Sequence, residues 1–387
     1  MQFSIKDTMR SAIETASGGR NTIMYDAQGN PNVMVCITKF DCENMDKEHK
    51  YDFGSGIHPM FNIMGKEVDE IWIGKYQSSR GAENTPVSLP NGSIIADAYH
   101  IKEHCEKIFA KGPGWHPVTN SEWGGIAMIQ HALRDGEEHG ATMNGGYCYK
   151  HPGDIPGKVD YNVDLNGNPY PVFTGSGPQS WTHDGTPFGI YDVIGNVWEL
   201  SKGACVYKDG NIMFSAVDGV PCNDPFDHEL YYRKKEGSVA PGTLTMHDGR
   251  WLSFGQHIYE VSVKNDKGIV EKRFALSDSN VLSINPNAEY ILRTWSGQTD
   301  HYSQVAHDHS AWLRQLALLP PMNIMREIGV FMFNMPDCDD YRELLRGCRN
   351  GDEKEMHSMY AYLPIMHPYL ESSNWSVRVA WVSPDKI

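Results

Sequence analysis

The sequence contains no long apolar segment. No stretch approaches the roughly 20 apolar residues that a membrane-spanning helix needs, so we expect no membrane insertion. The first seven residues, MQFSIKD, have no basic stretch followed by an apolar one, so we expect no signal peptide. The eight cysteines are scattered from Cys36 to Cys348 without CxxC spacing, which favours free thiols in a protein made in a cytoplasm.

Common motifs for phosphate binding and serine hydrolysis are missing as well. No GxSxG elbow, P-loop or GxGxxG cradle stands in a convincing context, and there is no internal repeat or low-complexity segment. The 49 acidic side chains outnumber the 34 basic ones, which gives a formal net charge of −15. Because this charge would repel phosphates, we expect no nucleic-acid binding.

The abundant residues indicate one large, loop-rich domain with an N-terminal extension. Hydrophobic residues make up 40% of the 387 positions and charged residues 21%, which is enough for a sizeable core. The chain also has 37 glycines, 19 tyrosines and 10 tryptophans. This mixture suits long connections that are held in place by buried aromatic rings.

Strand patterns occur near both ends of the sequence. Residues 1–55 are expected to be β-rich, with a hairpin formed by residues 22–25 and 33–37 around a turn-forming segment. A further strand is expected at residues 70–76. Late strands are expected at 329–333 and 377–382.

Two amphipathic helices are expected in the middle of the chain. Asp97 is a candidate cap for the first helix, whose apolar face would be Ile101, Cys105, Ile108 and Phe109. Thr119 and Glu122 form a capping-box pattern for the second helix. Its apolar face would be Trp123, Ile126, Ala127, Ile129 and Leu133. Residues 140–186 show few periodic signals, and such long irregular stretches usually serve function.

The most specific segment is residues 188–200, FGIYDVIGNVWEL. Gly195 and Asn196 form a turn pair, Val197 and Trp198 are expected to be buried, and the Asn196 and Glu199 side chains could tie down loop backbone. The segment closely resembles the G-[LI]-x-D-x-x-G-N-V-W-E-W signature of formylglycine-generating-enzyme-like proteins.

Other segments resemble the same family in the expected order. Residues 114–123 resemble its GWRLPTEAEWE segment, 345–348 its LRGGS strand, and 374–380 its terminal GFR-A strand without the Gly-Phe. The resemblance covers residues 56–387. It implies an α+β, C-type-lectin-like fold, loop-rich and preceded by the short β-rich extension at residues 1–55.

Within this superfamily the C-terminus resembles one subgroup most. Variable proteins of diversity-generating retroelements, of the bacteriophage major-tropism-determinant type, place a hypervariable stretch between an LLRGG-like strand and an SNW-like end. The corresponding ligand-binding region here is about 344–381, with the variable stretch between Arg346 and Ser376. Four basic and four acidic side chains balance in this region, so it is not an acidic cation trap.

The expected contact surface lies within this variable stretch. Tyrosine offers large contact area at low entropic cost, and methionine adapts to varied partners. The candidate ligand-binding residues are Arg349, Asn350, Asp352, Lys354, Met356, His357, Met359, Tyr360, Tyr362, Ile365, His367 and Tyr369. The alternative is that these aromatic and methionine side chains fill the core beneath the last strands.

The resemblance implies recognition rather than catalysis. The expected partners are a host-cell surface receptor, either protein or glycan, and the proteins of a phage tail or particle. The chain would then be made in a bacterial cytoplasm and work in the virion, as a homotrimer by analogy with related display proteins. No cofactor is expected, apart from a structural calcium that the resemblance allows near Asn196. A purely structural particle component is a further alternative.

The main enzymatic alternative is an oxidase of the formylglycine-generating type. Such enzymes rely on two nearby cysteines close to the C-terminus. Here Cys348 lies in the right neighbourhood, but no cysteine follows it, and Cys338 comes before the Arg-Gly strand. A thiol pair for metal-dependent oxidation is therefore not evident, and no catalytic residue is assigned.

Two histidine patterns are candidate metal sites. His100, His104 and Glu106 match the HxxxHxE pattern of iron-dependent sulfoxide synthases, which carry it on a helical bundle. Here the pattern falls on the first expected helix, where both histidines would flank the buried face at the surface. The second pattern is the looser cluster His301, His307, Asp308 and His309, for which a solvated or loop-pinning role is favoured.

Overall fold

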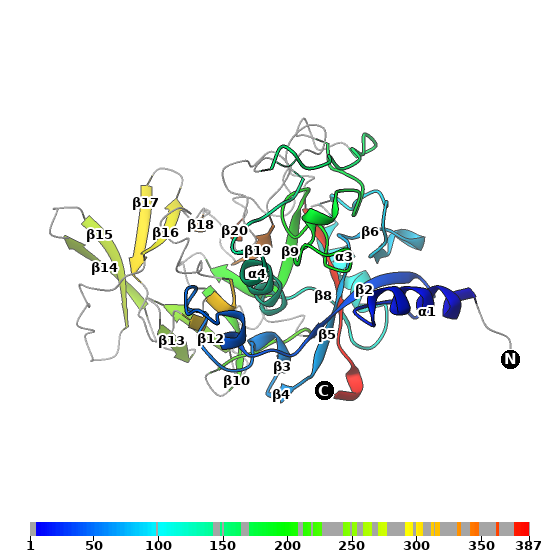
Figure 1. The fold of residues 1–387 in the computed structure, drawn as a ribbon. Helices are drawn as coiled ribbons and strands as arrows, with labels where there is room; N and C mark the ends of the chain where they lie inside the picture. The colour runs from blue at the N-terminus through cyan, green and yellow to red at the C-terminus, as the bar shows by residue number, and fades with distance from the viewer. Residues whose placement is uncertain are drawn as a thin grey trace.

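A five-stranded sheet built from both ends of the chain lies at the centre of the computed structural model (Figure 1). The structure describes residues 5–97, 100–141, 148, 151–163, 170–207, 221–226, 311–312, 314–317, 341–347 and 375–386, with the backbone of short strands between 212 and 304 and at 331–333 and 361–363. Helices and strands both contribute, so the chain is of the α+β class. Among the described helices, none is long and apolar enough to cross a membrane.

The central sheet has the order β1-β2-β5-β22-β8, and each neighbouring pair is antiparallel. Its strands are β1 (Asn21–Tyr25), β2 (Pro31–Thr38), β5 (Glu70–Gly74), β22 (Val379–Trp381) and β8 (Trp115–Pro117). The hairpin predicted within the first 55 residues is confirmed as β1 and β2. Because β2 pairs with β5, the N-terminal hairpin and the later part of the chain share one sheet.

Side chains alternate between the two faces of this sheet, as a period of two requires. One face contributes Val35, Ile37, Ile71, Ile73 and Ala380 to a core that also contains Trp123 and Ile126. The opposite face contributes Met34 and Val379 to a second core with Ile101, Ile108, Trp198 and Leu345. Both faces are therefore buried, so the C-terminal strand is fixed from two sides.

Two helices, α3 (Ile101–Phe109) and α4 (Asn120–Arg134), cover these faces, and the capping box predicted for the second is confirmed. Helix α4 begins with the predicted capping box, in which the Thr119 hydroxyl accepts from the Glu122 amide and the Glu122 carboxylate from the Thr119 amide. The predicted face is correct except at its end, where Leu133 is 61% exposed. Leu133 lies in the last turn, beyond the buried run of the helix that ends at His131.

Helix α3 (Ile101–Phe109) differs from the prediction in two details. His100, not Asp97, is the N-cap residue, although the Asp97 carboxylate accepts from the His100 amide at 3.3 Å. His104, predicted at the surface, is only 2% exposed, whereas His100 is exposed as predicted. His104 lies on the inward face because it is three residues after Ile101 and four before Ile108, and residues at these spacings lie on the same side of a helix.

The N-terminal segment contains a helix that the β-rich prediction missed. Helix α1 (Ile5–Ser17) contacts β1, and two of its polar side chains form hydrogen bonds with that strand. The Arg10 guanidinium donates to the Ile23 carbonyl at 2.9 Å, and the Glu14 carboxylate accepts from the Thr22 hydroxyl at 2.5 Å. Ile5, Met9 and Ile13 recur every four residues, so the segment has a helical period that the β-rich prediction overlooked.

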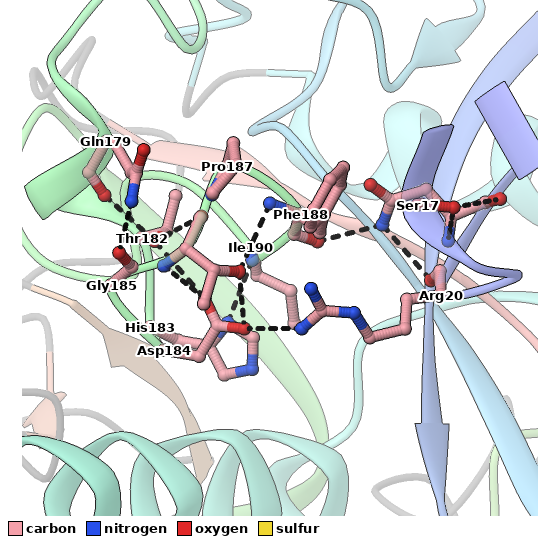
Figure 2. A network of polar contacts seen from close by, with 12 residues as sticks. Ser17, Arg20, Gln179, Thr182, His183, Asp184, Gly185, Pro187, Phe188 and Ile190 are labelled. Carbon is pink, nitrogen blue, oxygen red and sulfur yellow. Dashed lines mark hydrogen bonds and ion pairs between the residues drawn. The ribbon is translucent and has the colours of Figure 1, made fainter. Parts of the chain in front are cut away.

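Polar contacts tie this N-terminal part to the loop before residues 188–200 (Figure 2). Arg20 pairs with Asp184 at 3.6 Å, and its guanidinium lies 4.7 Å from the centre of the Phe188 ring. The Asn21 side-chain nitrogen donates to the Phe188 carbonyl at 2.8 Å. Lys75 donates to the Pro187 carbonyl at 2.6 Å, and burial lowers the pKa of Lys75 to about 8.

A larger mixed sheet is organised around β9 (Trp198–Tyr207). Its order is β13-β12-β10-β9-β19-β20-β18, with β11 on β10 and β21 on β9. These strands are β10 (Ile212–Val217), β11 (Val220–Pro221), β12 (Thr243–His247), β13 (Arg250–Ser253), β18 (Phe331–Phe333), β19 (Tyr341–Arg346), β20 (Ala361–Leu363) and β21 (Trp375–Val377). The late strands predicted at 329–333 and 377–382 correspond to β18 and to β21 with β22.

The remaining elements are short or lie at the edge. Two hairpins, β14 (Ile258–Lys264) with β15 (Val270–Leu276) and β16 (Ile291–Ser296) with β17 (Thr299–Gln304), lie at the end of the molecule opposite α1 (Figure 1). The short elements are α2 (Cys42–Met45), η1 (Pro59–Phe61), β3 (Asn62–Ile63), β4 (Lys66–Glu67), β6 (Ser79–Arg80), η2 (Ala82–Asn84), β7 (Pro86–Val87), η3 (Gln179–Trp181) and η5 (Pro384–Lys386).

The buried position of Trp198 gives a first testable prediction. Trp198 is 4% exposed and belongs to the core shared by α3, β9 and β22. We expect Trp198→Ala to lower the free energy of unfolding by about 3–5 kcal/mol, since it removes a large side chain from a packed core. Leu133→Ala, at an exposed position of α4, is the matched control and should change it by less than about 0.5 kcal/mol. Urea titration measures both, and equal losses would contradict this placement of the core.

Candidate functional site

The predicted contact surface falls almost entirely outside the described residues. Only Tyr362 belongs to a described element, the strand β20, of which the backbone alone is described. That strand pairs with β19 on one side and β18 on the other. The other predicted residues, from Arg349 to Tyr369, stay a prediction, so the described strands at either end of the segment carry the geometric argument.

Strands β19 and β21, which precede and follow this segment, flank the same short stretch of β9. Strand β19 runs antiparallel to β9, with Arg346 opposite Glu199. Strand β21 runs parallel to β9, with Trp375 opposite Trp198. Because neighbouring strands are about 4.8 Å apart, the segment between β19 and β21 starts and ends about 10 Å apart.

Arg346 fixes the start of this segment. Its side chain is fully buried and donates to the carbonyls of Ala317 at 2.8 Å and Leu316 at 3.3 Å. It also donates to the Asn120 side chain at the start of α4. Burial lowers the pKa of Arg346 to about 9, so the guanidinium stays charged at neutral pH. Carbonyl and amide oxygens thus accept from both terminal nitrogens of a buried cation at the exit of β19.

The next residue, Gly347, joins this exit to residues 188–200. The Gly195 amide donates to the Gly347 carbonyl at 2.6 Å. Gly347 has a φ of +85°, and a Cβ there would lie 2.7 Å from the Val193 carbonyl oxygen. Only glycine fits this close approach without strain. The start of the variable stretch is therefore locked to the Gly195–Asn196 turn.

The other end of the segment is fixed by an ion pair next to β21. Arg378, between β21 and β22, donates to both carboxylate oxygens of Glu199, at 2.8 and 2.7 Å. Arg378 is 0% exposed and Glu199 is 1% exposed. The guanidinium also donates to the Gly74 and Tyr191 carbonyls, both at 3.0 Å. One side chain thus links β5, β9 and the loop before it.

Asn196 completes this arrangement as predicted, because its side chain ties down loop backbone. Its carboxamide oxygen accepts from the Val172 amide at 2.8 Å, and its nitrogen donates to Gln77 at 2.9 Å. Gln77 in turn donates to Glu199 at 2.9 Å and to the Val197 carbonyl at 3.3 Å. The Asn196 side chain is thus engaged in holding loop backbone, and the structural calcium that the resemblance allows nearby stays a prediction.

Of the three rival patterns, only the HxxxHxE pattern has described side chains. Cys338 and Cys348 lie outside them, as do His307, Asp308 and His309, and His301 is described only as backbone of β17. His100 and His104 do converge on Asp97, at 2.9 and 3.8 Å. Burial lowers the pKa of His104, because a charged imidazole is disfavoured there.

A cluster in the irregular stretch escaped the sequence-based prediction. The ligand-capable atoms of His139, Cys148 and Asp154 all lie within 4.8 Å of one another. The His151 ring stacks on the His139 ring, with centroids 3.4 Å apart and planes 5° apart. Burial acts to raise the pKa of Asp154, but the hydrogen bond and charge of His139 outweigh it and hold this pKa below its usual value. The residues follow one another as H-x8-C-x2-H-x2-D, a spacing that could have drawn attention to them.

No protein-family model matches this chain, and no curated protein matches it either. Function is therefore inferred from residue identities and geometry, above all from residues 188–200 and the strands that surround them.

The close approach at Gly347 gives a second prediction. We expect Gly347→Ala to lower the free energy of unfolding by about 1–3 kcal/mol, because it combines a strained backbone with a clash. Gly203→Ala is the matched control, since Gly203 has a φ of +80° but a Cβ there would meet only Thr119 at 3.8 Å. The control should lose about 1 kcal/mol or less. Guanidinium unfolding measures the loss for both variants. An unchanged free energy of unfolding in Gly347→Ala would show that the close approach to Val193 is absent.

Proposed function

We propose that this chain is a ligand-binding protein that displays residues 349–372 on a C-type-lectin-like scaffold of the formylglycine-generating-enzyme type. The bound ligand would be a host-cell surface receptor, and the chain would serve as an attachment protein of a phage tail or particle. Display as a homotrimer would multiply weak contacts into avidity.

The observation that carries this proposal is the placement of β19 and β21 on either side of β9. A segment whose two ends are held on one strand can change its side chains without changing the frame that holds it. Binding residues commonly lie on such connections between rigid elements. The described frame, the sequence resemblance and the tyrosine- and methionine-rich content of the segment all favour the same function.

The described anchors at both ends support a frame that does not need the segment's own side chains. Arg346 and Gly347 are held by α4, Leu316, Ala317 and the Gly195 turn. At the far end, Trp375 is 7% exposed and Val377 is 0% exposed. These contacts are made by residues outside the span 349–372, so they remain when that span varies.

Alanine variants separate a contact surface from a core. We expect Arg349→Ala, His357→Ala, Tyr360→Ala and Tyr369→Ala each to change the free energy of unfolding by about 0.5 kcal/mol or less. Adsorption of the labelled protein to a panel of bacterial cells should weaken, and one or two tyrosine or arginine positions should cost about 2 kcal/mol or more of binding. Thermal melts and adsorption are measured on the same preparations.

Tyr161→Ala is the control for this series. Tyr161 is 73% exposed and lies in the irregular stretch, outside the proposed surface. It should alter neither stability nor adsorption. Large stability losses in most of the four variants would assign their side chains to the core, and loss of adsorption in Tyr161→Ala alone would move the ligand surface to the irregular stretch.

A further inference from the structure

Three chemically different ligand groups meet in the irregular stretch, away from the proposed ligand surface. Cys148 is buried, and His139 and Asp154 are half-buried beside it. An imidazole, a thiol and a carboxylate offer nitrogen, sulfur and oxygen donors to one point. This donor set is typical of zinc and related divalent transition metals, whereas calcium and magnesium prefer oxygen alone.

The distances are close to those that a tetrahedral ion needs. The three donor atoms lie within 4.8 Å of one another, and two of them, His139 Nδ1 and Asp154 Oδ2, are 2.6 Å apart. Zinc bonds of about 2.0–2.3 Å place tetrahedral ligand atoms about 3.5 Å apart. Displacements of the donor atoms by about 1 Å would therefore place all three at bonding distance from one ion.

Neighbouring residues already orient the carboxylate. The Trp181 indole donates to Asp154 Oδ2 at 3.1 Å. Trp181 itself is 1% exposed and is confined by two glycines, since a Cβ at Gly177 would lie 1.9 Å from its ring and one at Gly157 would lie 3.0 Å from it. Metal ligands are commonly held by such outer hydrogen bonds, which set their orientation and affinity.

We propose that His139, Cys148 and Asp154 form a binding site for a zinc-type divalent metal ion. The Cys148 thiol loses its proton to solvent, and its thiolate, the neutral His139 ring and the Asp154 carboxylate each donate one electron pair. The fourth position is left for water. His151, stacked on His139, restricts the rotation of that ring.

The metal would brace the irregular stretch against the turn at Gly195. Ala141, two residues after His139, pairs with Gly195, and its carbonyl accepts from the Asn196 amide at 3.0 Å. Linking His139 to Cys148 and Asp154 would close this segment into a loop anchored beside residues 188–200. The inference does not depend on the proposed ligand surface.

Cobalt titration of the full chain, after treatment with a chelator, tests the site directly. Thiolate ligation of Co²⁺ gives a near-ultraviolet charge-transfer band, and tetrahedral geometry gives intense visible bands. We expect one Co²⁺ per chain, both sets of bands, displacement by Zn²⁺ and a melting temperature that rises with Zn²⁺ concentration. A wild-type chain without these bands would overturn the proposal.

Two variants test the sulfur and oxygen ligands, and a third serves as control. Cys148→Ser should abolish the charge-transfer band, and Asp154→Asn, which preserves side-chain volume, should weaken Co²⁺ binding about tenfold or more. Cys36→Ser, at a half-buried thiol on β2, is the control and should leave the bands unchanged. A charge-transfer band that persists in Cys148→Ser, or unchanged affinity in Asp154→Asn, would assign the metal to other residues. If Cys148→Ser does not fold, the wild-type titration and Asp154→Asn still decide.

Discussion

The buried ion pair between Arg378 and Glu199 is the contact on which the rest of the described structure depends. Two charges leave water in this pair, which costs several kcal/mol unless other bonds compensate. The compensation here comes from the two hydrogen bonds of the bidentate pair and from the Gly74 and Tyr191 carbonyls, which accept from Arg378. Gln77 donates to the Glu199 carboxylate. Replacement of the pair by apolar side chains would leave the Gly74 and Tyr191 carbonyls without these donors. The pair therefore specifies how the two sheets meet, beyond any net stability that it adds.

The contact between the two sheets also places the strands that hold the segment between β19 and β21. Glu199 lies on β9 at the position that β19 and β21 flank, and Arg378 comes directly before the central strand β22. The pair, the Gly347 lock and the buried Arg346 hold both ends of the segment from outside it. A proposed site that is held in this way can tolerate side-chain change, which is what a variable contact surface requires.

The sequence predicted the elements that have a local chemical signature and missed those that depend on tertiary contacts. The capping box at Thr119, the N-terminal hairpin and the buried Trp198 each follow from short-range patterns and are confirmed. Helix α1 was missed although Ile5, Met9 and Ile13 follow a helical period, because the strand patterns after it were extended to the whole N-terminal segment. His104 was expected at the surface because Ile101, Cys105 and Ile108 were expected to form the buried face alone, whereas that face also includes His104. The cluster at Cys148 comes from an irregular stretch with no period, where the close spacing of its residues was the one signal and the folded structure shows that their donor atoms converge. The contact residues from Arg349 to Tyr369 remain a prediction.

A double-mutant cycle on Arg378 and Glu199 tests the central claim most directly. Free energies of unfolding are measured for Arg378→Gln, Glu199→Gln and the double variant. If the pair joins the sheets, each single change should cost about 3–5 kcal/mol, because it leaves a buried charge unpaired. The double variant should then cost less than the sum of the two by more than about 1 kcal/mol. Additive losses, or single losses below about 1 kcal/mol, would contradict the dependence of the frame on this ion pair.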